Sequence, residues 1–269
     1  MECGISTASL FSRYDVEDAL SVIAGMGAHT AEIFLNTHSE YEPEFIDLLQ
    51  HRAEDLNLHI HSLHAMSTQF EPQLFSIHAR QRKDAFRIFE RVLAAAKKLG
   101  AGVYVMHGPM HMSGVVKNME MERIGPIVYD LADLAASYGV TLTWENVSWC
   151  LFCHPDFAPR ILDASKSDKL RFTLDLKQAE RAGYSPFEFL ERMGENVANV
   201  HICDFRHDER LRLCMPGQGA FDFVRLRDEL CGYGYTGPVL IEVYSDLYGA
   251  DSELKACFDS MEHLFKGGK

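Results

Sequence analysis

The feature that most constrains the fold is an alternation of short, β-rich apolar segments with helical segments, repeated eight times in 269 residues. The strand-like segments span residues 3–9, 30–35, 58–64, 102–107, 140–148, 170–175, 198–201 and 239–242. The helical segments span residues 16–26, 43–56, 78–99, 119–138, 156–164, 186–193, 221–230 and 252–265. Such alternation is typical of a parallel β-sheet whose strands are joined by crossover helices.

The eight strand–helix units follow one another without a proline- or serine-rich linker, which predicts one domain over residues 1–269. Right-handed crossovers between adjacent strands would close this α/β chain into a single (β/α)8 TIM barrel. A doubly wound open sheet is the alternative, but no GxGxxG motif follows the first strand to support a dinucleotide-binding fold. In a barrel, functional side chains are expected at the C-terminal ends of the strands.

Charge and composition restrict the partners of the chain. Its net charge of −13 opposes general nucleic-acid binding, which requires a basic surface. No apolar run is long enough for a membrane span, and the first residues lack the pattern of a signal peptide. Seven scattered cysteines favour reduced thiols, so Cys150 and Cys153, a single CxxC pair, are interpreted as two unpaired thiols. We therefore expect a cytoplasmic protein, with a homo-oligomer left open.

Four successive strand-like segments end in a side chain that can bind a metal ion. These side chains are Glu145, Asp175, His201 and Glu242. A carboxylate buried alone at such a position would be costly, so we expect it to be solvated, paired or metal-bound. Three carboxylates and one imidazole suit one divalent ion, either Mn²⁺, Mg²⁺, Co²⁺ or Zn²⁺, and the ligand set does not choose among them.

Four sequence motifs accompany these strand ends. They are residues 144–146 (WEN), residues 174–175 with 182–183 (LD and AG), residues 201–204 with 216–223 (HICD and PGQGAFDF), and residues 232–244 (GYGYTGPVLIEVY). In this order they resemble the xylose-isomerase-like TIM barrel superfamily of sugar isomerases, epimerases and related lyases, over essentially the whole chain. The resemblance implies that the family's metal ligands fall on the four positions named above. It also implies that Glu145 and Glu242 are the catalytic acid/base pair.

Further pocket residues follow from the same resemblance. His64 and His107, at two strand ends, match histidines that line the family's pocket and could bind substrate hydroxyls or a second metal. The family often has a histidine three residues after the ligand aspartate, where this chain has Gln178. Lys177 is also unusual. It would face the pocket if strand geometry continues to residue 177, and would face solvent if the strand ends at Asp175.

Several other residues have two alternative interpretations. Arg206 could be a fork-shaped donor to substrate oxygens or a solvated loop residue. Trp149 could form a wall of a sugar pocket or pack on its loop. Glu32 could orient a pocket group or pair with a neighbour, while His59 and His61, earlier on their strand, are interpreted as structural.

The leading hypothesis is a divalent-metal-dependent isomerase or epimerase that acts on a keto-sugar or related polyol by proton abstraction through an enediolate. The alternative is a lyase or dehydratase that eliminates a β-substituent from a sugar, inositol ketone or glycoside at the same metal site, with Lys177 assisting. A three-zinc abasic-site endonuclease is disfavoured by Gln178, by the missing Asp-x-His motif after residue 201 and by the acidic charge. A non-catalytic sugar-binding module is disfavoured by the intact ligand set.

Overall fold

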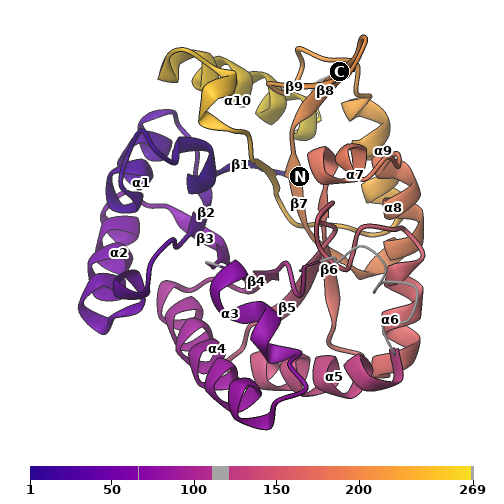
Figure 1. The fold of residues 1–269 in the computed structure, drawn as a ribbon. Helices are drawn as coiled ribbons and strands as arrows, with labels where there is room; N and C mark the ends of the chain where they lie inside the picture. Colours follow the sequence, from indigo (N-terminus) through magenta and orange to yellow (C-terminus); the bar gives the residue numbers. More distant parts are fainter. Residues whose placement is uncertain (66, 111–120, 268–269) are drawn as a thin grey trace.

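A closed barrel of eight parallel strands forms the centre of the protein (Figure 1). The computed structural model describes residues 1–65, 67–110 and 121–267. The barrel strands are β1 (Cys3–Ser6), β2 (Thr30–Phe34), β3 (His59–His64), β4 (Val103–Met106), β5 (Thr141–Glu145), β6 (Arg171–Asp175), β7 (Val197–Ile202) and β10 (Val239–Ile241). Their order around the barrel is β1-β10-β7-β6-β5-β4-β3-β2. The predicted (β/α)8 fold is therefore confirmed.

The barrel strands are accompanied by helices, most of which form an outer ring (Figure 1). They are α1 (Val16–Gly25), α2 (Pro43–Asp55), α3 (Ser67–Leu74), α4 (Ala79–Leu99), α5 (Met121–Ser137), α6 (Phe157–Ser165), α7 (Leu176–Arg181), α8 (Pro186–Met193), α9 (Phe223–Gly232) and α10 (Asp251–Phe265). Short 3₁₀ helices are η1 (Thr7–Leu10), η2 (His38–Tyr41), η4 (Gly194–Asn196) and η5 (Ser245–Leu247). Within the described ranges, no helix is both long enough and apolar enough to cross a membrane.

The longest helix shows how the sequence builds the outer ring. Along α4, Phe89, Val92 and Ala96 are fully buried, a spacing of three and four residues that turns one apolar stripe towards the barrel. The helix ends at Gly100, whose φ of 75° is in the left-handed region that a C-terminal cap requires. The next residues then enter β4 and return the chain to the sheet.

The inside of the barrel contains a polar layer below the strand ends. Its fully buried members are Ser6, Glu32, Ser62, Thr143, Thr173 and Asn199. The hydroxyls of Ser6 and Ser62 donate to the two oxygens of Glu32 at 2.9 and 2.7 Å. Branched apolar side chains usually fill a barrel interior. Here buried polar side chains take part of that space, and several of them are hydrogen-bonded to one another, as Thr143 Oγ1 is to Thr173 Oγ1 at 2.7 Å.

Three elements were not predicted from the sequence. Helix α3 lies in the loop predicted between β3 and α4, α7 follows β6 directly, and the antiparallel hairpin of β8 (Asp204–His207) and β9 (Leu211–Cys214) follows β7. Each is too short for a periodic apolar pattern to reveal it. Strand β1 is shorter than predicted because η1 begins at Thr7, and residues 119 and 120 of a predicted helix lie outside the described residues.

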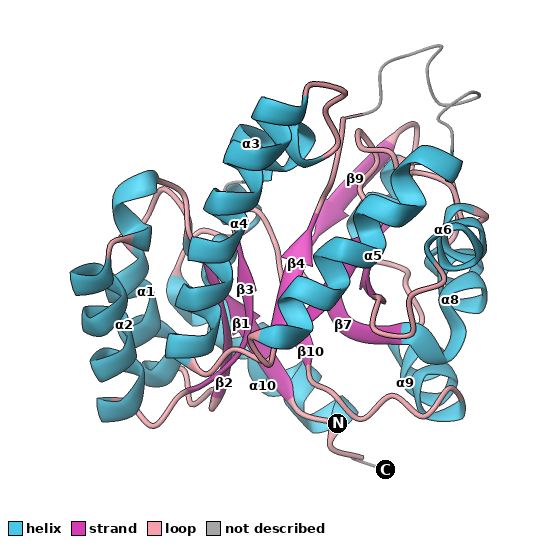
Figure 2. Ribbon diagram, turned by 90° about the horizontal axis from the view of Figure 1, so that it is seen from below, coloured by secondary structure: helices cyan, strands magenta, loops and turns pink. Residues whose placement is uncertain are grey.

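The added elements gather at one end of the molecule. Figure 2 shows α3 and β9 projecting at one end of the barrel, with the N-terminus at the other. Because β1 begins at Cys3, the end that carries α3 and β9 is the C-terminal end of the barrel strands. This is the end at which the predicted functional side chains are expected.

Candidate metal centre

The four predicted ligands come together at the C-terminal end of the barrel. One ligand atom from each of Glu145, Asp175, His201 and Glu242 lies within 4.8 Å of all the others. His201 is paired with Asp175 on β6 and with Leu240 on β10, so these strand ends are level. Glu242 lies two residues beyond Leu240 and therefore on the same face as that residue. The register thus brings four separate strand ends to one point.

His201 lies at the centre of this group. Its Nδ1 is 3.1 Å from Glu145 Oε1 and 2.5 Å from Glu242 Oε2. The same nitrogen is 3.8 Å from Asp175 Oδ2. On the other side of the ring, Nε2 is 3.0 Å from Glu32 Oε2. One ring nitrogen thus faces the carboxylates while a second-layer carboxylate fixes the other, as in many carboxylate–histidine–metal arrangements. Of the two roles considered for Glu32, orientation of a pocket group fits this contact with His201, and the hydroxyls of Ser6 and Ser62 pair with the same carboxylate.

The spacing of the group fits a divalent ion. Ligands about 2.0–2.3 Å from an ion, on opposite sides of it, lie up to about 4.0–4.6 Å apart. The four ligand atoms all lie within 4.8 Å of one another, so they are close enough together to surround one ion. Three carboxylate oxygens and one imidazole nitrogen are also a donor set that divalent ions accept. The residues present are therefore able to hold the ion that the sequence led us to expect.

Burial and charge act against each other in this group. Burial would raise the pKa of Glu145, but His107, His201 and His64 hold it well below its ordinary value. Burial likewise opposes ionisation of Glu242, whose pKa is lowered by Lys177 and His201. For Asp175 burial prevails over Lys177 and raises the pKa. The two glutamates are therefore strongly held as carboxylates.

Lys177 reaches the same group in a way that neither sequence interpretation described. The strand ends at Asp175, which caps α7 by accepting from the backbone N–H of Gln178 at 2.8 Å. Lys177 nevertheless is only 2% exposed. Its Nζ lies 2.5 Å from Asp175 Oδ2 and 3.1 Å from Glu242 Oε1. Burial opposes its charge, but Asp175 and Glu242 raise the pKa of Lys177 well above the ordinary value.

The asparagine of the WEN motif fixes the relative position of two ligands. Asn146 Nδ2 donates to the carbonyl of Asp175 at 2.8 Å, and Asn146 Oδ1 accepts from the backbone N–H of Asp175 at 2.8 Å. The residue after Glu145 thus clamps the backbone of the neighbouring ligand. In this motif, Glu145 is therefore a predicted ligand and Asn146 aligns the strand end that carries another.

Comparison with known proteins gives the family of the chain. A family model described as "Xylose isomerase-like TIM barrel" matches residues 20–265. The chain belongs to this family. The solved D-psicose 3-epimerase from Clostridium cellulolyticum H10 is 17% identical with a TM-score of 0.80, and the match covers 98% of this chain and 99% of that one. At this identity the likeness shows the shared fold.

Two further relatives bear on metal and reaction type within the family. The IolI protein, solved with a bound zinc atom, is 19% identical, has a TM-score of 0.80 and covers 99% of this chain and 98% of its own. An inosose dehydratase from Geobacillus kaustophilus is 27% identical over 143 residues, which are 47% of this chain and 46% of that protein. The family thus includes both epimerases and dehydratases.

The two predicted pocket histidines lie beside Glu145. His107 Nε2 is 2.7 Å and His64 Nε2 is 3.5 Å from Glu145 Oε2. These three residues also present ligand atoms within 4.8 Å of one another, so they form a second group able to hold a metal. Trp149, which is 38% exposed, stands perpendicular to the ring of His107 with the ring centroids 5.5 Å apart. All three predicted residues therefore border the metal centre.

Two other predicted substrate residues make contacts of a different kind. The side-chain oxygen of Gln178 accepts from the hydroxyl of Ser148 at 2.8 Å, which ties α7 to the loop after β5. Arg206, on β8, is exposed and its Nε donates to the carbonyl of Gln218 at 2.7 Å. A substrate role for either side chain would require it to leave these contacts, and both roles stay predictions.

Sequence reasoning missed the partners of the site. Glu71 on α3 and Asn199 on β7 are fully buried, and neither was singled out. Asn199 is visible in hindsight, because it lies two residues before His201 on the same face of its strand. Glu71 is not, since it lies in a short helix whose pattern resembles a polar loop.

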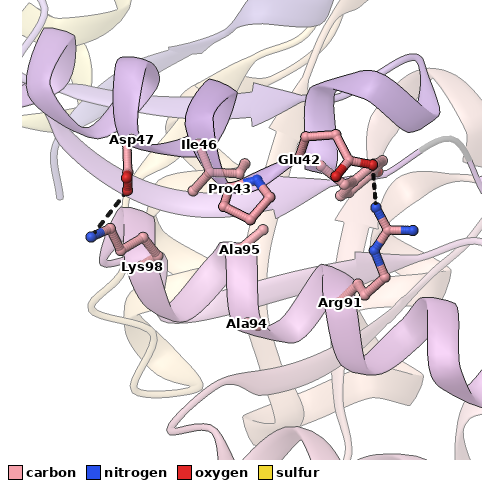
Figure 3. Close-up of a pocket in the computed structure, with 9 residues that line it drawn as sticks. Glu42, Pro43, Ile46, Asp47, Arg91, Ala94, Ala95 and Lys98 are labelled. Atoms are coloured by element: carbon pink, nitrogen blue, oxygen red, sulfur yellow. Dashed lines mark hydrogen bonds and ion pairs between the residues drawn. The ribbon is translucent and has the colours of Figure 1, made fainter.

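A separate hollow lies away from this chemistry. It lies between α2 and α4 on the outer wall of the barrel (Figure 3). Ile46 and Ala95 form part of its apolar floor, and the ion pairs Glu42–Arg91 and Asp47–Lys98 cross it at 2.8 and 3.1 Å. No predicted site residue lines it, so we assign it no part in the reaction.

A pH effect on stability is expected from His61, on β3. Burial lowers the pKa of His61 to about 4. The unfolded chain takes up this proton near pH 6.5, so stability falls as pH falls from 6.5 towards 4. His61→Gln should reduce the loss of unfolding free energy between pH 7 and pH 5 by about 2 kcal/mol. Denaturant unfolding of metal-free protein measures it, with exposed His59→Gln as the control. Equal pH dependence in His61→Gln and the parent would contradict the expectation.

Proposed function

We propose that this protein is a divalent-metal-dependent isomerase or epimerase. Its substrate would be a ketose or related polyol ketone, from which a carbon-bound proton next to the carbonyl is removed and replaced. One bound divalent ion would act as a Lewis acid towards the carbonyl and the neighbouring hydroxyl. The side chains of the chain then have to move the proton and hold the substrate.

The observation that carries this proposal is the placement of Glu145 and Glu242. Glu145 ends β5 and Glu242 follows β10, and these strands are separated in the barrel by β6 and β7. Both carboxylates nevertheless approach the same nitrogen of His201. Two carboxylates that converge from different strands can address the two faces of one carbon. Removal by one and return by the other inverts that carbon, whereas return to the neighbouring carbon gives isomerisation.

The surrounding residues support proton transfer by these two carboxylates. Both have pKa values below the ordinary value, so each is ionised and has an oxygen that can accept a proton. His64 and His107 lie beside Glu145 and can donate to substrate hydroxyls or to the enediolate oxygens. Trp149 can cover an apolar face of a sugar and limit access of water.

Proton exchange with solvent tests the proposal directly. The protein, loaded with Mn²⁺ or Zn²⁺, is incubated in D₂O with D-tagatose, D-psicose, D-fructose and inositol ketones. NMR should show deuterium at the carbon next to the carbonyl. It should also show an epimer or isomer that has the substrate's molecular formula apart from the deuterium. A metal-loaded protein that neither exchanges protons nor converts any member of this panel would contradict the assignment.

A second candidate, a dehydratase, is favoured by one residue. Lys177 places an ammonium beside Asp175 and Glu242, within the metal centre. After proton removal, an acid so placed could protonate a departing hydroxyl or alkoxide, which converts exchange into β-elimination. The inosose dehydratase among the relatives is consistent with such chemistry in the family.

The variant Lys177→Met separates the two reactions. If the protein is a dehydratase, elimination should fall by about 10²-fold or more while deuterium exchange continues, because only the departure of the leaving group loses its acid. Bound metal is measured alongside turnover. Arg181→Met is the matched control, since it removes an exposed cation one turn further along α7. Unchanged kcat and KM in metal-loaded Lys177→Met would remove the support for the dehydratase.

A further inference from the structure

Helix α3 carries a buried carboxylate that the proposed reaction does not use. Glu71 is fully buried, and its Oε1 accepts from the hydroxyl of Tyr104 at 2.5 Å. Its Oε2 accepts from the backbone N–H groups of His107 and Gly108 at 2.8 and 2.7 Å. Glu71 follows β3 whereas these partners lie on and after β4, so one carboxylate joins two neighbouring strand–helix units.

The same peptide is also held from its other side. The indole Nε1 of Trp144, on β5, donates to the carbonyl of His107 at 3.0 Å. Gly108 has a φ of 74°, and a Cβ at that position would lie 2.7 Å from the Trp144 ring. Glu71 therefore fixes the N–H groups of the turn at residues 107–108. Trp144 fixes the carbonyl of His107, and its ring packs against Gly108.

The side chain of His107 extends from this turn into the candidate metal centre. His107 Nε2 is 2.7 Å from Glu145 Oε2. Its ring stands at 82° to the ring of His64, with the centroids 4.5 Å apart, and at 90° to the ring of Trp149. The imidazole is thus positioned by its backbone and two perpendicular rings, and a shift of the backbone would move Nε2 away from Glu145.

We propose that Glu71 is a positioning residue for the reaction. Through the backbone N–H groups of residues 107 and 108 it holds the imidazole of His107 against Glu145 and towards the substrate. The inference rests on the proposed function for the importance of this contact to turnover. The placement of the imidazole itself can be tested without substrate.

Three variants of the full-length protein test the placement. Glu71→Met keeps the length of the side chain and removes both acceptor oxygens. Glu71→Gln keeps one oxygen for the two N–H groups. Tyr104→Phe removes a hydrogen bond to the same carboxylate but leaves the N–H contacts, and so controls for lost stability. The readouts are the melting temperature and the ring ¹⁵N resonances of His107, at one pH with Zn²⁺ present, assigned by loss of the signal in His107→Asn.

We expect Glu71→Met to shift the His107 resonances, Glu71→Gln to restore them, and Tyr104→Phe to lower the melting temperature without shifting them. If Glu71→Met does not fold, Glu71→Asp withdraws the carboxylate by one methylene and should give the same shift. Unchanged resonances in the folded Met or Asp variant would overturn the inference. So would an equal shift in Tyr104→Phe, because Glu71 would then be only a structural residue.

Turnover distinguishes a failure of this inference from a failure of the proposed function. In the deuterium-exchange assay, displacement of His107 should lower kcat/KM by about 10–100-fold. A displaced His107 with no change in exchange would count against the role of His107 in the proposed reaction and leave the placement by Glu71 intact. A His107 that stays in place without Glu71 overturns the inference whatever the activity.

Discussion

Replacing Glu242 by glutamine is expected to lower turnover by about 10²-fold or more while the protein stays folded. Glutamine has nearly the same shape but cannot take a proton from carbon. Glu242 is 15% exposed on its side chain and approaches both Lys177 and His201, so the substitution also removes a negative charge that both side chains face. Glu145→Gln should behave in the same way, since its carboxylate approaches the same nitrogen of His201 from another strand.

The measurement combines deuterium exchange with metal content, because both glutamates are also proposed ligands. Glu253→Gln is the matched control, as it removes an exposed carboxylate on α10, which follows β10. A metal-loaded Glu145→Gln or Glu242→Gln protein with full activity would exclude that residue from the acid/base pair. Loss of activity together with loss of metal would identify the residue as a ligand, and activity at saturating metal would then measure its acid/base role.

Removal of the imidazole should have the largest effect on metal binding. His201→Ala deletes the nitrogen donor of the cluster, and we expect the affinity for Zn²⁺ or Mn²⁺ to fall by more than the roughly 10–100-fold that loss of a second-layer partner causes. Glu32→Gln provides that comparison. It keeps the shape of the side chain that contacts His201 Nε2 and removes its charge.

Titration calorimetry against a competing chelator measures both affinities, and circular dichroism confirms the fold. His59→Gln, at the exposed first residue of β3, is the control and should bind metal as the parent does. The order of the effects matters as much as their size. If Glu32→Gln weakened binding more than His201→Ala, His201 would not be a ligand, and its polar partners would need another explanation.

The four proposed ligands could be predicted because each carries a local signal. Glu145, Asp175 and His201 are each the polar end of an apolar strand, and a closed barrel necessarily brings such ends to one face. Register then determines how close they come. The pairing of Asp175 with His201 depends on strand alignment, which alternation alone does not specify.

The remaining contacts depend on geometry that no local pattern contains. Glu32 meets His201 across the barrel, although β2 and β7 are separated by β1 and β10. Lys177 was predicted to face either the pocket as part of a strand or solvent. It instead turns inward from the first turn of a helix, because Asp175 caps α7 immediately. Glu71 contacts backbone N–H groups, which every residue except proline has, so no sequence pattern marks its partners.

Asp175 combines two duties in one carboxylate. Its Oδ1 caps the N-terminus of α7 by accepting from the backbone N–H of Gln178, and its Oδ2 faces His201 and Lys177. In a survey of random mutations, position 175 would therefore score as essential for two unrelated reasons, and an inactive Asp175→Ala protein would not reveal which had failed. Asparagine separates them, because its oxygen still caps a helix while its lost charge weakens ion binding. A lineage that abandoned metal chemistry could thus retain its architecture by exchanging one atom at this position.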